Sequence, residues 1–128
     1  METKYPLSAA NEDYLEAIFE LRDEQGATRS VDLAEHLQVS KASVNKAVGI
    51  LREAGLVEQE PYGAIRLTQT GQERAAEIFR RHTRIKRFLV EILGIDEETA
   101  EQDACRMEHV ISTVTRDHLY KYLREVLE

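Results

Sequence analysis

Apolar residues recur with the 3.6-residue period of a helix in the first part of the chain. Between Asn11 and Leu21 they fall on one face of such a helix. Ser8 or Asn11 can cap its first turn with a side-chain oxygen, and Gly26 is expected to end it. This segment is therefore predicted to be an amphipathic helix.

The same period returns in two segments joined by a brief turn. The first runs from Val31 to Leu37 with Ser30 as its cap, and the second from Lys41 to about Ala54, where Gly55 closes it. Residues 38–40 form the turn. The positions expected to face inward are Val31, Leu33, Ala34 and Leu37 in the first segment and Val44, Val48 and Leu51 in the second. A short helix, a tight turn and a longer helix are typical of the helix-turn-helix.

The pattern then changes to the two-residue alternation of strands. Residues 56–60 and 64–68 alternate, and Pro61, Tyr62 and Gly63 form a turn between them. A helix-turn-helix followed by a β-hairpin is a winged helix. Residues 1–70 are therefore predicted to be a winged-helix DNA-binding domain.

Helical patterning resumes after the hairpin. Thr70 and Glu73 form a capping box for a long helix that reaches about Leu93 and ends at Gly94. Asp96 is expected to cap the helix that follows, residues 97–111.

A last amphipathic helix is predicted over residues 116–127. Its apolar face is expected to carry Leu119, Tyr122, Leu123 and Val126. The chain is therefore expected to be mostly α-helical, with a winged helix-turn-helix followed by a helical domain over residues 71–128. The apolar stripes of these helices exceed what a monomer of 128 residues would cover, which favours a homodimer.

Composition narrows the setting in which the protein works. No apolar run approaches the length of about 18 residues that spans a membrane, and the start of the chain lacks the apolar core of a secretory signal. The single cysteine cannot form an internal disulfide, which suits the reducing cytoplasm. The net charge of −7 argues against a protein that coats nucleic acid without specificity.

The charge distribution is nevertheless compatible with specific DNA binding. Residues 40–52 contain three basic residues and no acidic one. Ser40, Lys41 and Ser43, at the start of the second helix of the helix-turn-helix, suit phosphate contacts. Asn45 could reach adenine, while Lys46 suits either guanine or a phosphate. On the wing, Tyr62 and Arg66 are candidates for backbone contacts.

Three residues of the predicted helix 97–111 carry groups that bind divalent metals. Cys105, Glu108 and His109 stand at i, i+3 and i+4, which places a thiol, a carboxylate and an imidazole on one helix face. All three groups bind transition metals when deprotonated. The triplet is therefore a candidate metal site.

Further candidate ligands lie on other helices. Asp13 and Glu16 have the i, i+3 relation on the first helix, and His82 lies on the long helix. Together with the triplet they are enough for one metal ion, or for two that share carboxylates.

Each candidate ligand also has an ordinary structural explanation. Cys105 alone fits a small buried apolar side chain, and His109 a core or surface histidine. Asp13 and Glu16 fit a solvated first helical turn, where acids favour the helix dipole. Because spacing does not show that the three helices converge, the chemistry alone leaves a metal site and its absence both open.

Two other functions compete with a metal sensor. One is a metal-independent winged-helix regulator that senses oxidants through Cys105, which would need an exposed thiol of low pKa. The other is an enzyme, but the chain has no Glu-x-x-His motif for a di-iron bundle and no sign of an oxyanion site for a Cys–His pair. His36 and His118 are expected to be surface residues.

Two stretches resemble segments of one known family. Residues 11–21, Asn-Glu-Asp-Tyr-Leu-Glu-Ala-Ile-Phe-Glu-Leu, look like a first helix, and residues 103–110, Asp-Ala-Cys-Arg-Met-Glu-His-Val, contain a Cys-x-x-Glu-His metal motif. Both resemble the iron- and manganese-dependent repressors, the diphtheria toxin repressor and manganese transport regulator family. The winged helix and His82 match the family in order and spacing, so the resemblance covers essentially the whole chain.

The resemblance implies a repressor of short, two-domain form. Residues 71–128 would bind metal and dimerise, and the homodimer would bind double-stranded operator DNA in response to Mn(II) or Fe(II). One or two ions would bind per subunit, and the regulated genes would be those of metal uptake. The implied metal ligands are Asp13, Glu16, His82, Cys105, Glu108 and His109. Of these, Glu16 and His82 correspond to ligands of a second metal in the manganese-type arrangement.

The chain departs from both branches of this family. Asp13 stands where the iron-type branch usually has Met, Lys86 where it has an acidic ligand, and Cys105 where the manganese-type branch usually has Glu. The chain stops at Glu128, so the extra C-terminal domain of the longer iron-type repressors is expected to be absent. The acidic pair on the first helix favours Mn(II), with Fe(II) close behind, because both ions suit hard oxygen donors.

Overall fold

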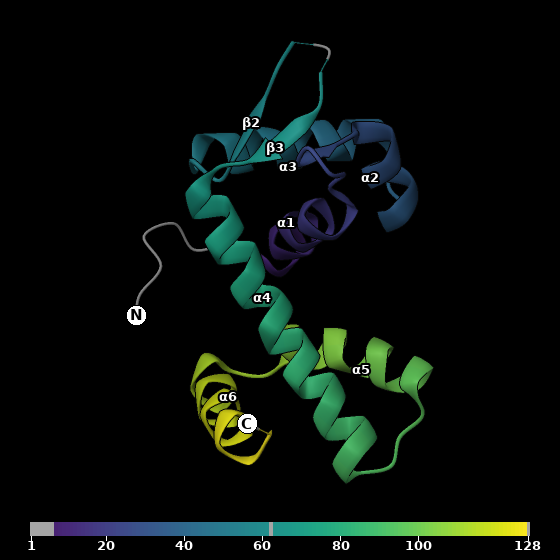
Figure 1. The fold of residues 1–128 in the computed structure, drawn as a ribbon, viewed down its shortest axis with the longest axis vertical. Coiled ribbons are helices and arrows are strands. Elements are labelled where there is room, and N and C mark those ends of the chain that lie inside the picture. Colours follow the sequence, from purple (N-terminus) through teal and green to yellow (C-terminus); the bar gives the residue numbers. More distant parts are fainter. Residues whose placement is uncertain (1–6, 62, 128) are drawn as a thin grey trace. The chain divides into compact units, whose positions relative to one another are not determined.

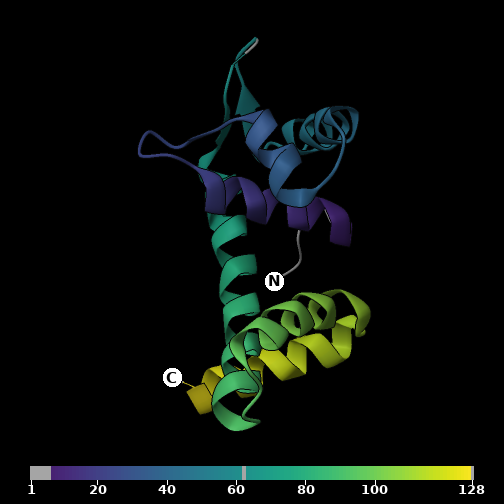
Figure 2. The ribbon, with the colours of Figure 1, turned by 90° about the vertical axis from the view of Figure 1, so that its right-hand side faces the viewer.

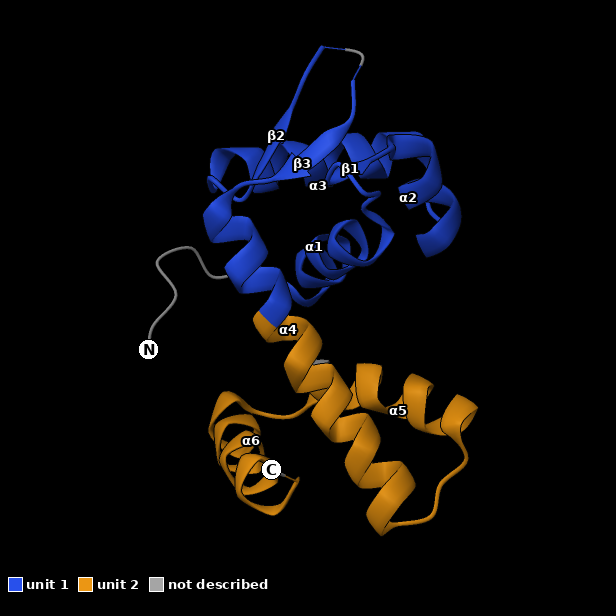
Figure 3. Cartoon of the chain, in the orientation of Figure 1, with its two compact units in different colours: residues 1–76 blue, residues 77–128 orange. Residues whose placement is uncertain are grey.

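The computed structural model describes residues 7–61 and 63–127, apart from the side chain of His109. The chain forms two compact units, residues 1–76 and 77–128 (Figure 3). Unit 1 is a winged helix and unit 2 is helical. The predicted fold class, mostly α with an N-terminal winged helix-turn-helix, is confirmed.

Helix α1 (Ala9–Leu21) begins at Ser8, whose hydroxyl accepts a hydrogen bond from the Asn11 amide at 3.1 Å. This confirms one of the two predicted caps. The prediction that Gly26 ends the helix is wrong. Helix α1 ends at Leu21. Gly26, at φ +81°, lies in the turn that leads from this helix to a short strand, β1 (Ala27–Thr28). A strand of two residues has no alternation by which it could be predicted.

Helices α2 (Ser30–Leu37) and α3 (Lys41–Glu53) form the predicted helix-turn-helix. The turn passes through Gln38, the only described non-glycine residue with positive φ. Ser40 caps α3 by accepting a hydrogen bond from the Ser43 amide at 3.1 Å. Figure 2 shows α1 lying across this helix pair.

The core of the helix-turn-helix is formed mainly by α3, where Val44, Val48 and Leu51 are buried as predicted. Two details of α2 are corrected. Ser30 is the first residue of the helix rather than its cap, and Val31 is 45% exposed. The buried residue of α2 is Leu33, because eight residues present only a narrow face to the core.

The wing is the antiparallel pair of β2 (Val57–Gln59) and β3 (Ile65–Leu67), which confirms the predicted hairpin. Strand β1 pairs with the other side of β3, so the sheet order is β1-β3-β2. Figure 1 shows the hairpin projecting beyond the helices of unit 1. Tyr62, predicted to contact DNA, lies outside the described residues.

Helix α4 (Gln69–Arg87) begins in unit 1 and continues into unit 2. The predicted capping box at Thr70 is wrong, because the helix already begins at Gln69. Thr68 provides the cap instead, and its hydroxyl accepts a hydrogen bond from the Gly71 amide at 3.0 Å. A Cβ atom at Gly71 would lie 1.9 Å from the carbonyl oxygen of Leu56, so this position requires glycine.

The backbone widens after α4 into a π-helical turn, η1 (Phe88–Ile92), before Gly94 at φ +73° ends the run as predicted. The regular helix predicted to continue to Leu93 therefore stops at Arg87. A π-turn inserts one residue into the helical register, and the apolar period does not reveal such an insertion.

Helices α5 (Glu97–Val110) and α6 (Thr113–Leu127) complete unit 2 and lie on either side of the C-terminal half of α4 (Figure 1). Asp96 caps α5 as predicted, accepting a hydrogen bond from the Thr99 amide at 3.0 Å. Helix α6 begins before the predicted Arg116, because Ser112 caps it.

The core of unit 2 is formed by Ile85, Leu89, Ala100, Ala104, Tyr120 and Leu123. The predicted apolar face of the last helix is correct for Leu123 and for Leu119, which is partly buried against this core. It is wrong for Tyr122 and Val126, which are exposed. The inward aromatic residue of α6 is Tyr120. No helix in the described part of the chain is long and apolar enough to cross a membrane.

Candidate functional site

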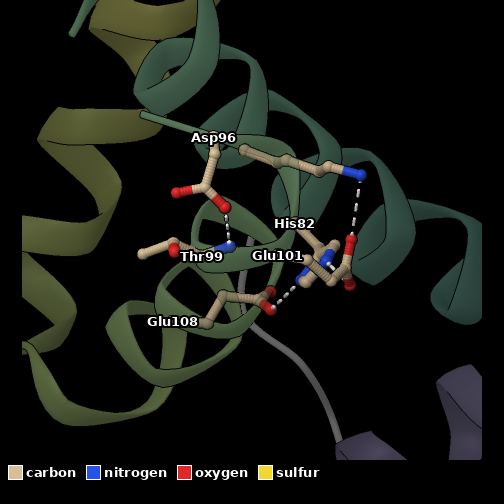
Figure 4. Close-up of polar contacts among 6 residues, drawn as sticks. His82, Asp96, Thr99, Glu101 and Glu108 are labelled. Carbon is tan, nitrogen blue, oxygen red and sulfur yellow. Dashed lines mark hydrogen bonds and ion pairs between the residues drawn. The ribbon is translucent and has the colours of Figure 1, made fainter. Parts of the chain in front are cut away.

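The centre of the candidate site is a buried histidine–carboxylate pair in unit 2. His82 on α4 and Glu108 on α5 are 6% and 3% exposed, and Nδ1 of His82 lies 3.7 Å from Oε2 of Glu108. Figure 4 shows the two side chains directed toward each other. The structure thus brings together two of the predicted metal ligands that are 26 positions apart in the sequence (108 − 82).

A third residue, Glu101 on α5, holds the far side of the imidazole. Its Oε2 lies 2.6 Å from Nε2 of His82, and its Oε1 lies 3.2 Å from Nζ of Lys86. A carboxylate only accepts hydrogen bonds, so Nε2 is the donor. Burial opposes the ionisation of Glu101, but the charge and hydrogen bond of His82, with the help of Lys86, lower its pKa below the ordinary value.

The surroundings of Glu108 fit a metal ligand. Its Oε2 atom is buried and has no hydrogen-bond partner among the described residues. A buried carboxylate is costly unless it is paired or coordinates a metal. Two ligand atoms that share an ion at about 2.1 Å lie roughly 3.0–3.4 Å apart, so a small shift from the observed 3.7 Å would allow His82 and Glu108 to share one. The pair therefore fits a divalent cation.

Glu101 is not among the ligands or contacts predicted from the sequence. It precedes Glu108 by seven residues, two helical turns, so it lies on the same face of α5. That spacing was available in the sequence. The sequence does not show that Glu101 contacts α4, and this contact distinguishes it from the other acidic residues of α5.

The remaining predicted ligands are placed as follows. Cys105 lies on α5 and is partly buried. In unit 1, Asp13 and Glu16 share α1, where Asp13 is partly buried and Glu16 is buried. His109 belongs to α5, but its side chain lies outside the described residues.

Two histidines expected to be surface residues are exposed. His36 lies near the end of α2, and Nδ1 of His118 lies 2.8 Å from the carbonyl oxygen of Val114 within α6. Neither of them lies beside a described candidate ligand in the contacts observed.

The candidate DNA-binding surface lies on α3 in unit 1. Lys41, Asn45 and Lys46 are exposed, outside the buried stripe of the same helix. The hydroxyl groups of Ser40 and Ser43 are hydrogen-bonded to each other at 3.0 Å and remain exposed to solvent. Exposed basic and amide side chains at the start of a second helix suit contacts in a major groove.

Arg66 on β3 has a structural partner. Its Nη1 atom donates a hydrogen bond to the carbonyl oxygen of Gln25 at 2.5 Å, which ties the wing to the turn after α1. A role for this arginine at the DNA backbone would compete with that contact.

Comparison with known proteins covers almost the whole chain. Residues 6–65 match the family model described as the iron dependent repressor, N-terminal DNA binding domain. Residues 68–127 match the iron dependent repressor, metal binding and dimerisation domain.

Individual relatives agree with these matches. The chain is 36% identical over 120 residues to an uncharacterised helix-turn-helix transcriptional regulator of Methanocaldococcus jannaschii, covering 93% of this chain and 96% of that protein. It is 40% identical over 106 residues to the transcriptional regulator MntR of Escherichia coli, covering 83% of this chain and 68% of MntR.

Solved structures resemble the chain as well. The manganese regulator SloR superposes with a TM-score of 0.71 at 31% identity, covering 89% of this chain. This chain spans 53% of SloR, about half the length of that protein.

Proposed function

The chain belongs to the iron-dependent repressor family, and from this premise we propose that it is a metal-dependent transcriptional repressor. The proposed ligand is Mn(II) or Fe(II), and the proposed target is double-stranded operator DNA, bound by a homodimer. Genes of metal uptake are the proposed targets of regulation.

One observation carries the metal-dependent part of this proposal. The His82–Glu108 pair is buried, and Oε2 of Glu108 has no hydrogen-bond partner among the residues described. This pair lies in the half of the chain that matches the metal-binding and dimerisation domain. A carboxylate left in this state fits a role as metal ligand better than a purely structural role.

The proposed ligand set follows the family pattern. It consists of Asp13, Glu16, His82, Cys105, Glu108 and His109, with one or two ions per subunit. Oxygen and imidazole donors suit Mn(II) and Fe(II), while the Cys105 thiolate also suits softer ions such as Zn(II). Cellular metal levels would therefore contribute to the choice of ion.

The bound ion supplies positive charge that offsets the carboxylates of the set. In its absence Asp13, Glu16 and Glu108 would oppose a common arrangement through their like charges. His82 contributes a neutral nitrogen donor from α4. Because the proposed ligands come from both units, binding would favour one arrangement of the DNA-binding helices.

The linkage between the two ligands is reciprocal. If the metal raises DNA affinity by a factor, DNA raises metal affinity by the same factor. Coupling of this kind typically amounts to about 5–150-fold.

On the DNA side, we assign different roles to the residues of α3 and the wing. Ser40, Lys41 and Ser43 are proposed phosphate contacts, and Asn45 a base contact. Lys46 suits either role. Tyr62 and Arg66 remain proposed backbone contacts of the wing, Arg66 with the competing contact described above.

The proposal is tested by selecting sites from random duplex DNA at fixed salt with Mn(II), Fe(II) under anaerobic conditions, Zn(II) or a chelator. A specific site should be enriched with metal only. Asp13→Ala and Glu108→Ala should each abolish the metal-dependent gain in affinity while leaving the fold intact by circular dichroism. Glu97→Ala, which removes an exposed acid from the first turn of α5, is the matched control and should behave as wild type. If Glu108→Ala kept the metal-dependent gain in DNA affinity of wild type, Glu108 would not be a metal ligand.

The alternative of an oxidant sensor is not supported. The family match describes metal binding, and Cys105 is partly buried in the part of the chain that carries this match. If peroxide, rather than chelator, released DNA, that alternative would replace the present proposal.

Two further points rest on the family. Its members named above are transcriptional regulators, and we propose that this chain likewise has no enzymatic activity. We place it in the cytoplasm, because that is where the DNA it is proposed to bind would be met.

A further inference from the structure

We infer that Glu101 is a positioning residue, which holds the imidazole of His82 in the orientation and tautomer that present Nδ1 to Glu108. Lys86 in turn holds Glu101. The inference rests on the proposed function in so far as it assigns Nδ1 of His82 to the metal ion.

The first step concerns the two ring nitrogens of His82. Nε2 donates to the Glu101 carboxylate at 2.6 Å, and the opposite nitrogen, Nδ1, lies 3.7 Å from Oε2 of Glu108. In a neutral imidazole only one nitrogen carries a proton, so a proton on Nε2 leaves the lone pair on Nδ1. Glu101 therefore selects the nitrogen that is able to bind a cation beside Glu108.

The second step concerns the surroundings of the ring. His82 is almost fully buried, whereas the side chain of Glu101 is 53% exposed. An exposed carboxylate has water as an alternative partner and would hold a ring poorly by itself. Lys86, at 3.2 Å from the other carboxylate oxygen, fixes its position.

The third step concerns the helices. His82 and Lys86 are four residues apart on α4 and therefore share one face of it. One carboxylate on α5 thus bridges two successive turns of α4 (Figure 4). Lys86 is also the position where the chain carries a base in place of the acidic ligand of the iron-type branch. In this chain that position supports a ligand without being one.

The experiment compares Glu101→Ala with Glu101→Gln. Both variants lose the same negative charge, but only glutamine retains an oxygen that can accept from Nε2. Glu98→Ala, which removes an exposed acid from the same helix, controls for net charge.

The first measurement is the tautomer of His82 in the metal-free protein, by nitrogen NMR at a pH where the two ring-nitrogen shifts show that the imidazole is neutral. We expect the Nε2–H form in wild type, Glu101→Gln and Glu98→Ala, and a mixture of forms in Glu101→Ala. An unchanged tautomer in Glu101→Ala would overturn the inference. Because no metal is present, this result does not depend on the proposed function.

The second measurement is Mn(II) affinity by electron paramagnetic resonance, with Co(II) absorbance as a second probe. Glu101→Ala should bind about 10–100-fold more weakly than wild type, and Glu101→Gln should recover most of this loss. Equal losses in the two variants would make Glu101 a direct ligand or a source of charge and would overturn the positioning role. If wild type bound neither ion, the proposed function would fail, while the tautomer would still decide the inference about His82.

Lys86→Met tests the last link. It should shift the tautomer of His82 toward the mixture seen in Glu101→Ala and weaken Mn(II) binding by a smaller factor. If Lys86→Met kept both the His82 tautomer and the Mn(II) affinity of wild type, Lys86 would have no part in positioning Glu101.

Discussion

Glu108 shows how a single side chain can cost stability and serve function. Its carboxylate is 3% exposed, and one of its oxygens has no hydrogen-bond partner among the described residues. Burying such a group is unfavourable, and a cation that binds it recovers the loss. We therefore expect Glu108 to make the metal-free protein less stable than a neutral side chain of the same shape would.

Glu108→Gln should separate these two effects. Without metal, the variant should be as stable as wild type or more stable, by up to about 3 kcal/mol, because the buried charge is gone. With saturating Mn(II), wild type should gain stability in proportion to the logarithm of metal concentration, and the variant should not. Thermal unfolding with and without metal measures both.

A marked loss of stability in metal-free Glu108→Gln would contradict this account. It would mean that the contact with His82 stabilises the fold by itself. The control is Glu98→Gln, which changes an exposed acid of α5 and should alter neither the stability nor the response to metal.

At the scale of elements, helix starts and helix-to-strand junctions depend on particular small contacts. Thr68 joins the end of the wing to α4, since its hydroxyl donates to the Gly55 carbonyl at 2.7 Å and accepts from the Gly71 amide at 3.0 Å. Gly71 then lies against the backbone of Leu56. The first turn of α4 is thus fixed to the beginning of the wing.

Gly71→Ala should destabilise the protein by at least about 1–3 kcal/mol, because the added Cβ would meet the Leu56 carbonyl oxygen at 1.9 Å and force a backbone shift. Gly49→Ala is the matched control. It lies inside α3, where nothing is within 4 Å of an added Cβ, and it should stabilise by about 0.5–1 kcal/mol. Urea unfolding gives the free energy of unfolding of each variant. Equal values for Gly71→Ala and Gly49→Ala would contradict the close contact between Gly71 and Leu56.

The cap of α5 should make part of the stability dependent on pH. Hydrogen bonds from the Thr99 amide and side chain lower the pKa of Asp96 below its ordinary value of 3.8. Its contribution is therefore complete above pH 3.8 and is lost as the pH falls through the lower, folded-state pKa. Asp96→Ala should have a lower Tm than wild type at neutral pH, and this gap should narrow in acid. A gap independent of pH would show that the charge of Asp96 has no part in the cap.

These elements also show what could be predicted from the sequence. The helix-turn-helix, the hairpin and the caps at Ser8 and Asp96 are local, because each depends on residues within one or two turns. The cap at Thr68 is not predicted, because Thr70, with Glu73 three residues further on, fits the local pattern of a capping box. The strand β1, the partners of Glu101 and the close approach at Gly71 depend on segments distant in the chain, and no local pattern contains them.

For the candidate site, the sequence and the family resemblance predicted His82 and Glu108, and the structure places them side by side in unit 2. It also shows Glu101 in contact with both His82 and Lys86, a contact that neither the sequence nor the resemblance predicts. Asp13, Glu16, Cys105 and His109 remain predicted ligands, to be tested by substitution.

At the scale of the whole molecule, symmetry is the main expectation. Large apolar side chains of unit 2 are exposed on a single chain, among them Val110 at 77% and Val114 at 68%. The family match includes a dimerisation domain in this half. A two-fold dimer presents two copies of α3 related by the same axis.

The operator should therefore be a palindrome. Its half-sites should be about 34–36 Å apart, one turn of DNA, or a multiple of this distance. Analytical ultracentrifugation should give a dimer at the concentrations at which the selected site is bound. A monomer that binds an asymmetric site with full affinity would contradict the expectation.

The contact of Glu101 with two turns of α4 also limits how such a chain can change in length. Each residue added to an α-helix rotates everything beyond it by about 100°. A single insertion between His82 and Lys86 would therefore place the two side chains on different faces of α4, and one carboxylate on α5 could no longer contact both. Loop tips tolerate insertions, but this turn of α4 tolerates them only when they restore the angular relation of the two side chains. The number of residues between His82 and Lys86 is thus as much a part of the site as the histidine itself.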